Sequence, residues 1–72
     1  MKKYEYKFVE VPMVMKKKAL IMLGDKRLSL EACKEVINEN AIEGWQLKQL
    51  LEPKNLDLDS EFYEVILERE IK

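Results

Sequence analysis

The N-terminal segment, residues 3–11, alternates between apolar and polar side chains, as a half-buried β-strand does. Its aromatic residues share one parity, and therefore one face of the strand: Tyr4, Tyr6 and Phe8. Val9 and Val11 have the opposite parity, so we expect the end of this strand to be covered on both sides. Pro12 cannot donate a hydrogen bond to a neighbouring strand, which suits a strand end or an edge.

Two further alternating segments lie in the C-terminal half of the chain, at residues 45–51 and 61–71. In the second of them, Tyr63, Val65 and Leu67 share one apolar face. The residues between the two segments are mostly polar and include Asn and Asp, which favour turns. We therefore predict that the last two strands form a hairpin.

A helix is predicted over residues 30–42, because apolar residues recur there at spacings of three and four. These residues are Leu30, Cys33, Val36, Ile37 and Ala41. Ser29 precedes them as the predicted N-cap, since its hydroxyl can accept a hydrogen bond from a free backbone N–H of the first turn. Gly44 follows as the predicted left-handed residue that ends the helix.

Residues 13–24 follow neither pattern, and two interpretations of them stay open. In the first, they form an irregular or hairpin arm with Lys16, Lys17 and Lys18 at its tip. In the second, they form a short helix that ends at Gly24. The lysines interrupt any helical stripe of apolar residues, so the pattern favours the arm.

The order of these elements predicts a single small α+β domain over residues 1–72, with an arm between the first strand and the helix. In this β-α-β-β fold, the helix packs on a three-stranded antiparallel sheet whose first strand pairs with the last, which gives the strand order 1-3-2. A chain of 72 residues buries only about 60% of the surface that its unfolded form exposes, less than a larger domain does, so we expect its stability to be marginal. Chains of this size often gain stability by association, and we expect self-association.

The composition restricts the chemistry of the chain. Histidine is absent, which excludes imidazole-based triads and dyads and imidazole ligation of a metal. The one cysteine, Cys33, cannot form a disulfide within the chain or a zinc site built from several cysteines. We therefore expect no enzyme activity, no cofactor and no metal site.

The expected location is the cytoplasm. A single thiol suits a reducing compartment. Residues 4–10 are too polar for the apolar region of a signal peptide. The longest apolar run, residues 19–23, is far shorter than a membrane span, so we expect no membrane partner.

Charge is unevenly distributed along the chain, although the net charge is −1. Residues 1–27 contain eight basic and three acidic side chains, whereas residues 28–72 contain five basic and eleven acidic ones. Such asymmetry can steer one copy of the chain onto another, or the basic half onto an anion. The same charge distribution would arise if two solvated faces of the chain differed only in the sign of their charge.

Three short motifs resemble a known family. The first opens the chain, the second closes the predicted helix and the third ends the last strand: Tyr4-Glu5-Tyr6-Lys7, Asn38 with Glu43-Gly44-Trp45-Gln46-Leu47, and Leu67-Glu68-Arg69-Glu70. This pattern is similar, over nearly the whole chain, to the bacterial family called domain of unknown function 4177. The resemblance implies the fold predicted above and implies no activity or catalytic residue. The lysine-containing arm, and Gln46 in place of an acidic residue, depart from the family pattern.

Several residues have both a structural and a functional interpretation. Trp45 can seal the helix against the sheet or stack on a ligand, and we favour the first. The aromatic face of the first strand, with Tyr63, can pack in a core or stack nucleotide bases, but the chain lacks the basic balance of a nucleic-acid-binding protein. Asp57 and Asp59 imitate a calcium loop, but Phe62 stands where that loop needs glycine.

The arm is the best functional candidate, because methionines adapt to irregular partner surfaces and its apolar residues exceed what a helix on a sheet needs. We predict a non-catalytic module that self-associates through apolar residues in and beside the arm: Val11, Met13, Met15, Leu20 and Met22. The alternative is a regulatory module that binds a larger protein or a nucleic acid through Lys16, Lys17 and Lys18. A third interpretation has the arm folded back over the open sheet face of its own chain.

Overall fold

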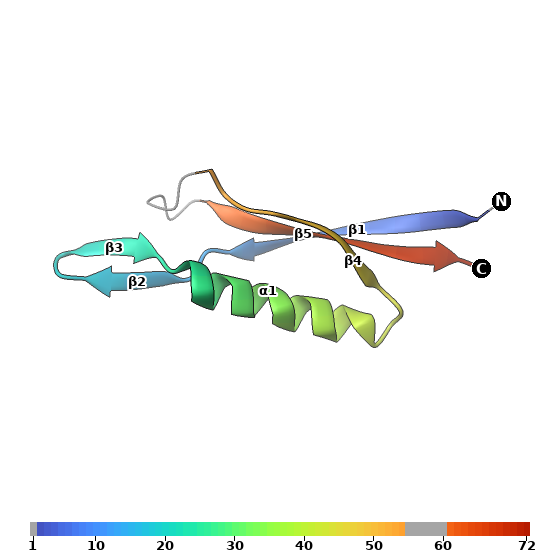
Figure 1. The fold of residues 1–72 in the computed structure, drawn as a ribbon, viewed down its shortest axis with the longest axis horizontal. Coiled ribbons are helices and arrows are strands. Elements are labelled where there is room, and N and C mark those ends of the chain that lie inside the picture. Colours follow the sequence, from blue (N-terminus) through green and yellow to red (C-terminus); the bar gives the residue numbers. More distant parts are fainter. Residues whose placement is uncertain (1, 55–60) are drawn as a thin grey trace.

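The computed structural model describes residues 2–54 and 61–72 of the chain. Its elements follow one another in this order: β1 (Lys3–Pro12), β2 (Met15–Lys18), β3 (Ile21–Gly24), α1 (Lys26–Ala41), β4 (Gln46–Leu51) and β5 (Phe62–Ile71). The molecule is elongated, with principal extents of 54 × 21 × 13 Å. Figure 1 shows the β2–β3 hairpin at the end opposite to both termini. Across the described ranges, no helix is long and apolar enough to cross a membrane.

The main sheet consists of β1, β5 and β4 in that order, and both pairings are antiparallel. The first strand therefore lies beside the last, as predicted. Val9 lies opposite Val65 and Val11 opposite Tyr63, and β4 holds one extra residue at Lys48, where its register on β5 shifts. The α+β class with one helix and antiparallel strands is confirmed. The predicted set of three strands is too small, since the described residues form five strands in two sheets.

The second sheet is the arm, in which β2 and β3 pair with each other. Of the two interpretations of residues 13–24, the hairpin arm is confirmed and the short helix is wrong. The predicted place of the lysines at the tip is also wrong, because they belong to β2. Ala19 and Leu20 form the tight turn that joins the two strands. Ala19 has φ +57°, and Leu20 is 95% exposed.

The helix α1 begins at Lys26 and not at residue 30, because Asp25, and not Ser29, is its N-cap. The Asp25 carboxylate accepts a hydrogen bond of 3.0 Å from the backbone N–H of Leu28. Ser29 lies inside the helix and is fully buried. Its hydroxyl donates to the Asp25 carbonyl at 2.7 Å and accepts from the Val14 N–H at 2.9 Å, which ties the base of the arm to the helix.

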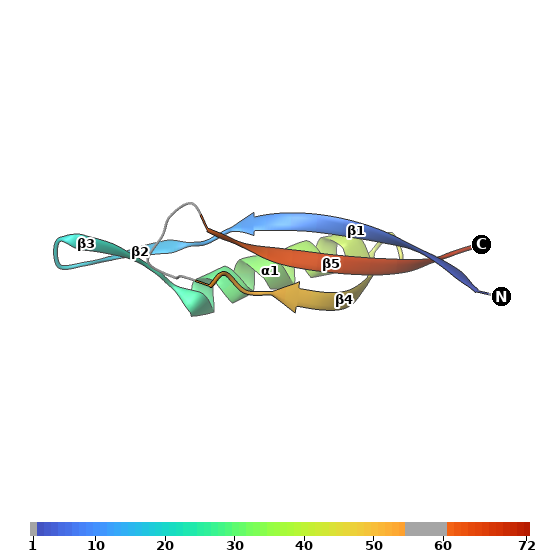
Figure 2. The ribbon, with the colours of Figure 1, turned by 90° about the horizontal axis from the view of Figure 1, so that it is seen from above.

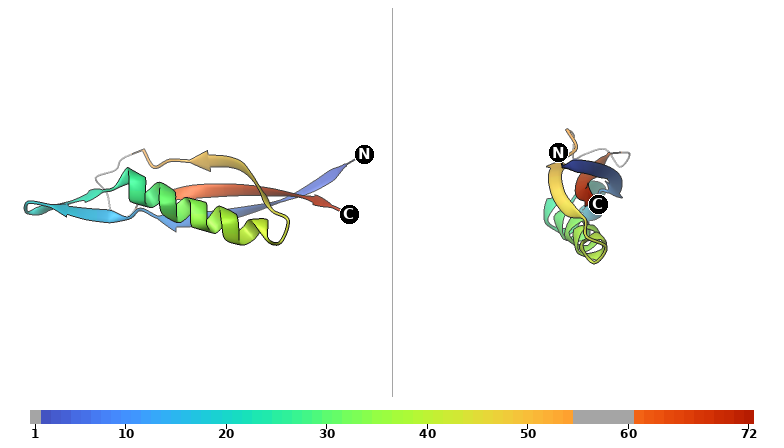
Figure 3. Two further views of the ribbon diagram at one scale, coloured as in Figure 1. Left: turned by 60° about the horizontal axis from the view of Figure 1, so that its bottom comes forward. Right: turned by 90° about the vertical axis from the view of Figure 1, so that its right-hand side faces the viewer.

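The core lies between α1 and one face of the main sheet. Its fully buried β5 residues are Tyr63, Val65 and Leu67, and its other buried hydrophobic residues are Val11, Met13, Cys33 and Trp45. The end-on view in Figure 3 shows α1 on one side of the strands. Figure 2 looks onto the other side of the sheet, with α1 behind it. The expectation that the end of β1 is covered on both sides is therefore wrong, because the one helix covers only the Val9 and Val11 side.

Candidate functional site

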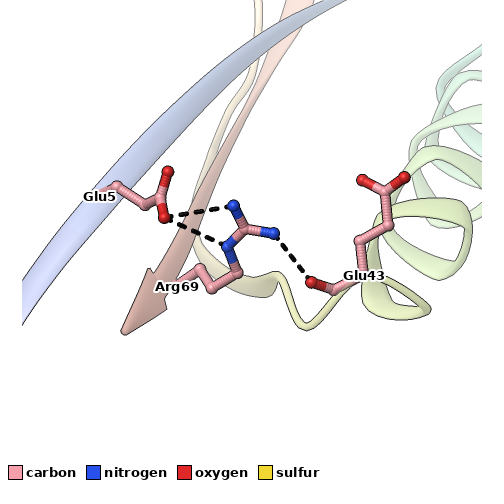
Figure 4. A network of polar contacts seen from close by, with 3 residues as sticks. All are labelled: Glu5, Glu43 and Arg69. Carbon is pink, nitrogen blue, oxygen red and sulfur yellow. Dashed lines mark hydrogen bonds and ion pairs between the residues drawn. The ribbon is translucent and has the colours of Figure 1, made fainter. Parts of the chain in front are cut away.

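One residue from each of the three sequence motifs takes part in a polar cluster, formed by Glu5, Glu43 and Arg69, as Figure 4 shows. The Arg69 guanidinium donates from Nε and Nη2 to one carboxylate oxygen of Glu5, at 3.3 and 3.2 Å. Its Nη1 donates to the backbone carbonyl of Glu43 at 3.0 Å. Glu5 and Arg69 are opposite each other on β1 and β5, and Glu43 follows the end of α1. One side chain thus joins the sheet to the end of the helix.

Two cations lie close to the ring of Trp45 at this helix end. The centre of its ring is 4.3 Å from the guanidinium carbon of Arg69 and 5.7 Å from Nζ of Lys7. Both distances lie in the range of cation–π attraction. The indole belongs to the buried core, which fits the interpretation that it seals the helix against the sheet and leaves little of the ring for a ligand.

Asn40 holds the chain as it leaves α1. Its backbone carbonyl accepts from the N–H groups of Glu43 at 3.0 Å and Trp45 at 3.2 Å. Its side-chain oxygen accepts from Lys7 Nζ at 2.6 Å, and its side-chain amide donates to a carbonyl one turn earlier. Gly44 has φ +92°, the left-handed conformation predicted for the residue that ends the helix.

An open groove of about 500 Å³ lies beside this cluster. It is lined by Glu5, Glu43, Gly44 and Arg69 and by residues 70–72 at the end of the chain. Because Arg69 already donates to Glu5 and Glu43, its hydrogen bonds hold the helix end against the sheet. The cluster is best explained as a structural support.

No pattern in the sequence predicts that the side chains of this support meet. Glu5 and Lys7 are far along the chain from Asn40 and from Arg69, and no local spacing connects these three segments. The family resemblance could have identified three of these residues, because Glu5, Lys7 and Arg69 belong to the motifs that carry it.

A second exposed feature is the face of the main sheet that α1 does not cover, which we call the open face. It combines aromatic, aliphatic and acidic residues at the even-numbered positions of β1 and β5: Tyr4, Tyr6, Phe8, Glu10, Phe62, Glu64, Ile66, Glu68 and Glu70. Tyr4, Tyr6 and Phe8 are 41%, 50% and 63% exposed. The sequence already indicates this open face. Its β1 residues have the parity opposite to Val9 and Val11, and one helix can cover only one face of a sheet.

The predicted interface residues separate into two groups. Val11 and Met13 are buried in the core of their own chain, so they are withdrawn as interface candidates. They are buried because β1 and the base of the arm continue under the start of α1. Met15 is half-buried and packs against the same core, whereas Leu20 and Met22 are exposed on the hairpin.

The predicted basic residues are all exposed on the hairpin. They are Lys16, Lys17 and Lys18, and none of them forms an ion pair with a residue in the described ranges. Alternation along β2 places Lys16 and Lys18 on one side of the hairpin and Lys17 on the other. The three charges therefore do not form one continuous basic surface.

The remaining candidates lie elsewhere. Cys33 is buried in the core, and this burial raises the pKa of its thiol, which keeps the group protonated and unreactive. Asp57 and Asp59, which imitate part of a calcium loop, lie outside the described residues. Within residues 2–54 and 61–72, no three side chains of the types that ligate metals come together.

Comparison with known proteins agrees with the motif pattern. A family model described as domain of unknown function (DUF4177) matches residues 4–70. The match includes the residues that converge on Arg69. Neither the curated proteins nor the solved structures give a match. Since the family description states no activity, the geometry of the chain has to carry the functional argument.

Proposed function

This chain belongs to the DUF4177 family, and we propose that it is a non-catalytic interaction module that associates with a second copy of itself. The observation that carries the proposal is the open face, on which Tyr4, Tyr6 and Phe8 form an exposed row along β1. Exposed aromatic surface is costly in water, and aromatic residues are enriched in the cores of interfaces.

The shape of the open face supports association rather than catalysis. It is a sheet surface, and the groove beside Arg69 lies at the end of α1 instead. In a two-fold pair, each copy can cover the open face of the other. Association also adds buried area to a chain of 72 residues.

The proposal is tested by molar mass, measured by light scattering after size exclusion at low and high salt. We expect the wild type to be a dimer or larger at both salts, because salt screens charges and leaves apolar contacts in place. Phe8→Glu is expected to give a folded monomer, since Phe8 is exposed in the single chain. Ile42→Glu is the matched control, because it makes the same change at an exposed residue beside the end of α1.

Two results would overturn this proposal. The first is a wild-type chain that is monomeric at both salts. The second is a Phe8→Glu variant that keeps the wild-type mass, because the open face would then not be the contact. A loss of association in Ile42→Glu as well as Phe8→Glu would assign the effect to added charge in general.

A second candidate function rests on the exposed lysines of β2, which suit binding to a nucleic acid or to an acidic region of a larger protein. Its support is weaker, because Lys17 lies on the opposite side of the hairpin from Lys16 and Lys18. Titration with a duplex oligonucleotide tests the nucleic-acid form. Binding that weakens steeply with salt and is lost in Lys16→Glu would favour it, and absence of binding at low salt would exclude it.

A further inference from the structure

The hairpin arm and the open face are complementary in charge. From Met15 to Gly24, the arm contains three lysines and no acidic residue. Its exposed apolar side chains are Leu20, Ile21 and Met22. The open face combines exposed aromatic residues with four carboxylates, namely Glu10, Glu64, Glu68 and Glu70, of which Glu68 forms an ion pair with Lys48. One surface is basic and apolar, and the other is acidic and apolar.

Two of these carboxylates face each other without a cation. Glu10 and Glu64 are directly opposite on β1 and β5, a position at which like charges repel. Neither forms an ion pair with a described residue. The exposed side chains of Phe8 and Phe62 lie on the same face, on either side of the pair. This part of the open face therefore suits a partner that brings cations together with apolar side chains.

One side of the hairpin meets both requirements. The pairing places Lys16 opposite Leu23 and Lys18 opposite Ile21, so two cations and two aliphatic residues share that side. The opposite side carries Met15, which packs against the core of its own chain. The Lys16 and Lys18 side therefore faces away from the chain's own core.

The arm does not cover the open face of its own chain, so that interpretation of residues 13–24 is wrong. Figures 1 and 2 show the hairpin continuing beyond the end of the main sheet instead of lying over it. The described residues give β2 and β3 no strand partner other than each other. Both the arm and the open face are thus available to a second molecule.

We propose that the arm of each copy docks on the open face of the other copy, with Lys16 and Lys18 against Glu10 and Glu64. This inference rests on the proposed self-association and specifies how the two copies meet. In a closed two-fold pair, each copy supplies one arm and one face, so the two contacts form together. Apolar side chains supply most of the affinity, and the charges set the orientation of the copies.

A charge-exchange experiment tests this arrangement. The arm variant carries Lys16→Glu and Lys18→Glu, and the face variant carries Glu10→Lys and Glu64→Lys. Alone, each variant places like charges across both contacts, which is expected to weaken association about a hundredfold and give a monomer. An equal mixture has opposite charges at both contacts again. It is expected to form a heterodimer with twice the mass of one chain.

Lys17→Glu is the matched control, because it reverses a neighbouring lysine on the other side of the hairpin and is expected to remain dimeric. Circular dichroism establishes that each variant is folded. Should a reversed variant be unfolded, Lys18→Gln and Glu64→Gln replace it, and unchanged association in both would overturn the arrangement.

The outcomes separate this inference from the proposed function. If the wild type associates but both reversed variants stay dimeric, or their mixture stays monomeric, docking of the arm is overturned and self-association stands. If the wild type is itself monomeric, the proposed function fails together with the inference. If each reversed variant alone is monomeric and their mixture forms a dimer, the result supports both the self-association and the docking of the arm.

Discussion

Arg69 shows how much of this fold depends on the shape of one side chain. Its planar guanidinium donates in two directions, to the carboxylate of Glu5 and to the carbonyl of Glu43, while its face lies over the ring of Trp45. Lysine has a single donor atom and no planar face, so it can replace the charge but not this combination of contacts. The end of α1 therefore depends on an arginine at this position.

Arg69→Lys is expected to lower the free energy of unfolding by about 1 kcal/mol, because the stacking on Trp45 and one of the two hydrogen-bonding directions are lost. For a chain of this size, the melting temperature then falls by roughly 4–8 °C, which thermal unfolding followed by circular dichroism measures. Lys26→Ala is the control, since it removes an exposed ion pair with Glu52 and is expected to change little. Equal melting temperatures for Arg69→Lys and wild type would contradict this role.

At the scale of elements, the sequence patterns predicted the strands and the helix that have one buried face. They did not predict the first residue of the helix or the pairing in the arm, where two local structures compete. Alternation identified β5 because Tyr63 and its alternate neighbours are fully buried under α1. The predicted start of α1 was four residues too late because Asp25 and Ser29 are both good caps, and residues 26–28 are exposed and add nothing to the apolar stripe. The pairing within the arm stayed open because both sides of the hairpin mix lysine with apolar residues.

The candidate site was predicted less well than the fold, for a related reason. The arm is visible in the sequence as a surplus of apolar residues, but only the structure separates the buried Met13 from the exposed Met22. The support around Arg69 joins residues from β1, the end of α1 and β5, and such long-range contacts leave no periodic trace in a sequence.

Ser29→Ala tests how the arm is attached to the helix. It removes the buried hydroxyl that accepts from the Val14 N–H, and the unsatisfied groups are expected to cost about 1–3 kcal/mol. Hydrogen exchange at the Val14 amide is expected to become faster, because the base of the arm loses its tie to α1. Asp25→Ala is the matched variant, since it removes the cap bond to Leu28 and leaves the serine hydroxyl in place. Unchanged exchange at Val14 in Ser29→Ala would show that this bond does not hold the arm.

At the scale of the whole molecule, one small core supports two separate surfaces. The open face belongs to the main sheet, whereas the hairpin extends beyond the end of that sheet in a molecule 54 Å long. The arm reaches the core through its base, at Met13 and Met15. Its outer part lies beyond the core cluster, so we expect that part to serve association and not the stability of the single chain.

Shortening the arm separates these two roles. Replacing residues 16–23 with Asn-Gly closes the hairpin with a two-residue turn between Met15 and Gly24, which already lie opposite each other. The shortened chain is expected to keep a cooperative thermal transition, because the residues buried between α1 and β5 are untouched. It is expected to be a monomer by light scattering, because nothing remains to reach the open face of a second copy. A shortened chain that still dimerises would mean that the open faces associate without the arm, and one that fails to fold would place the hairpin within the stable core.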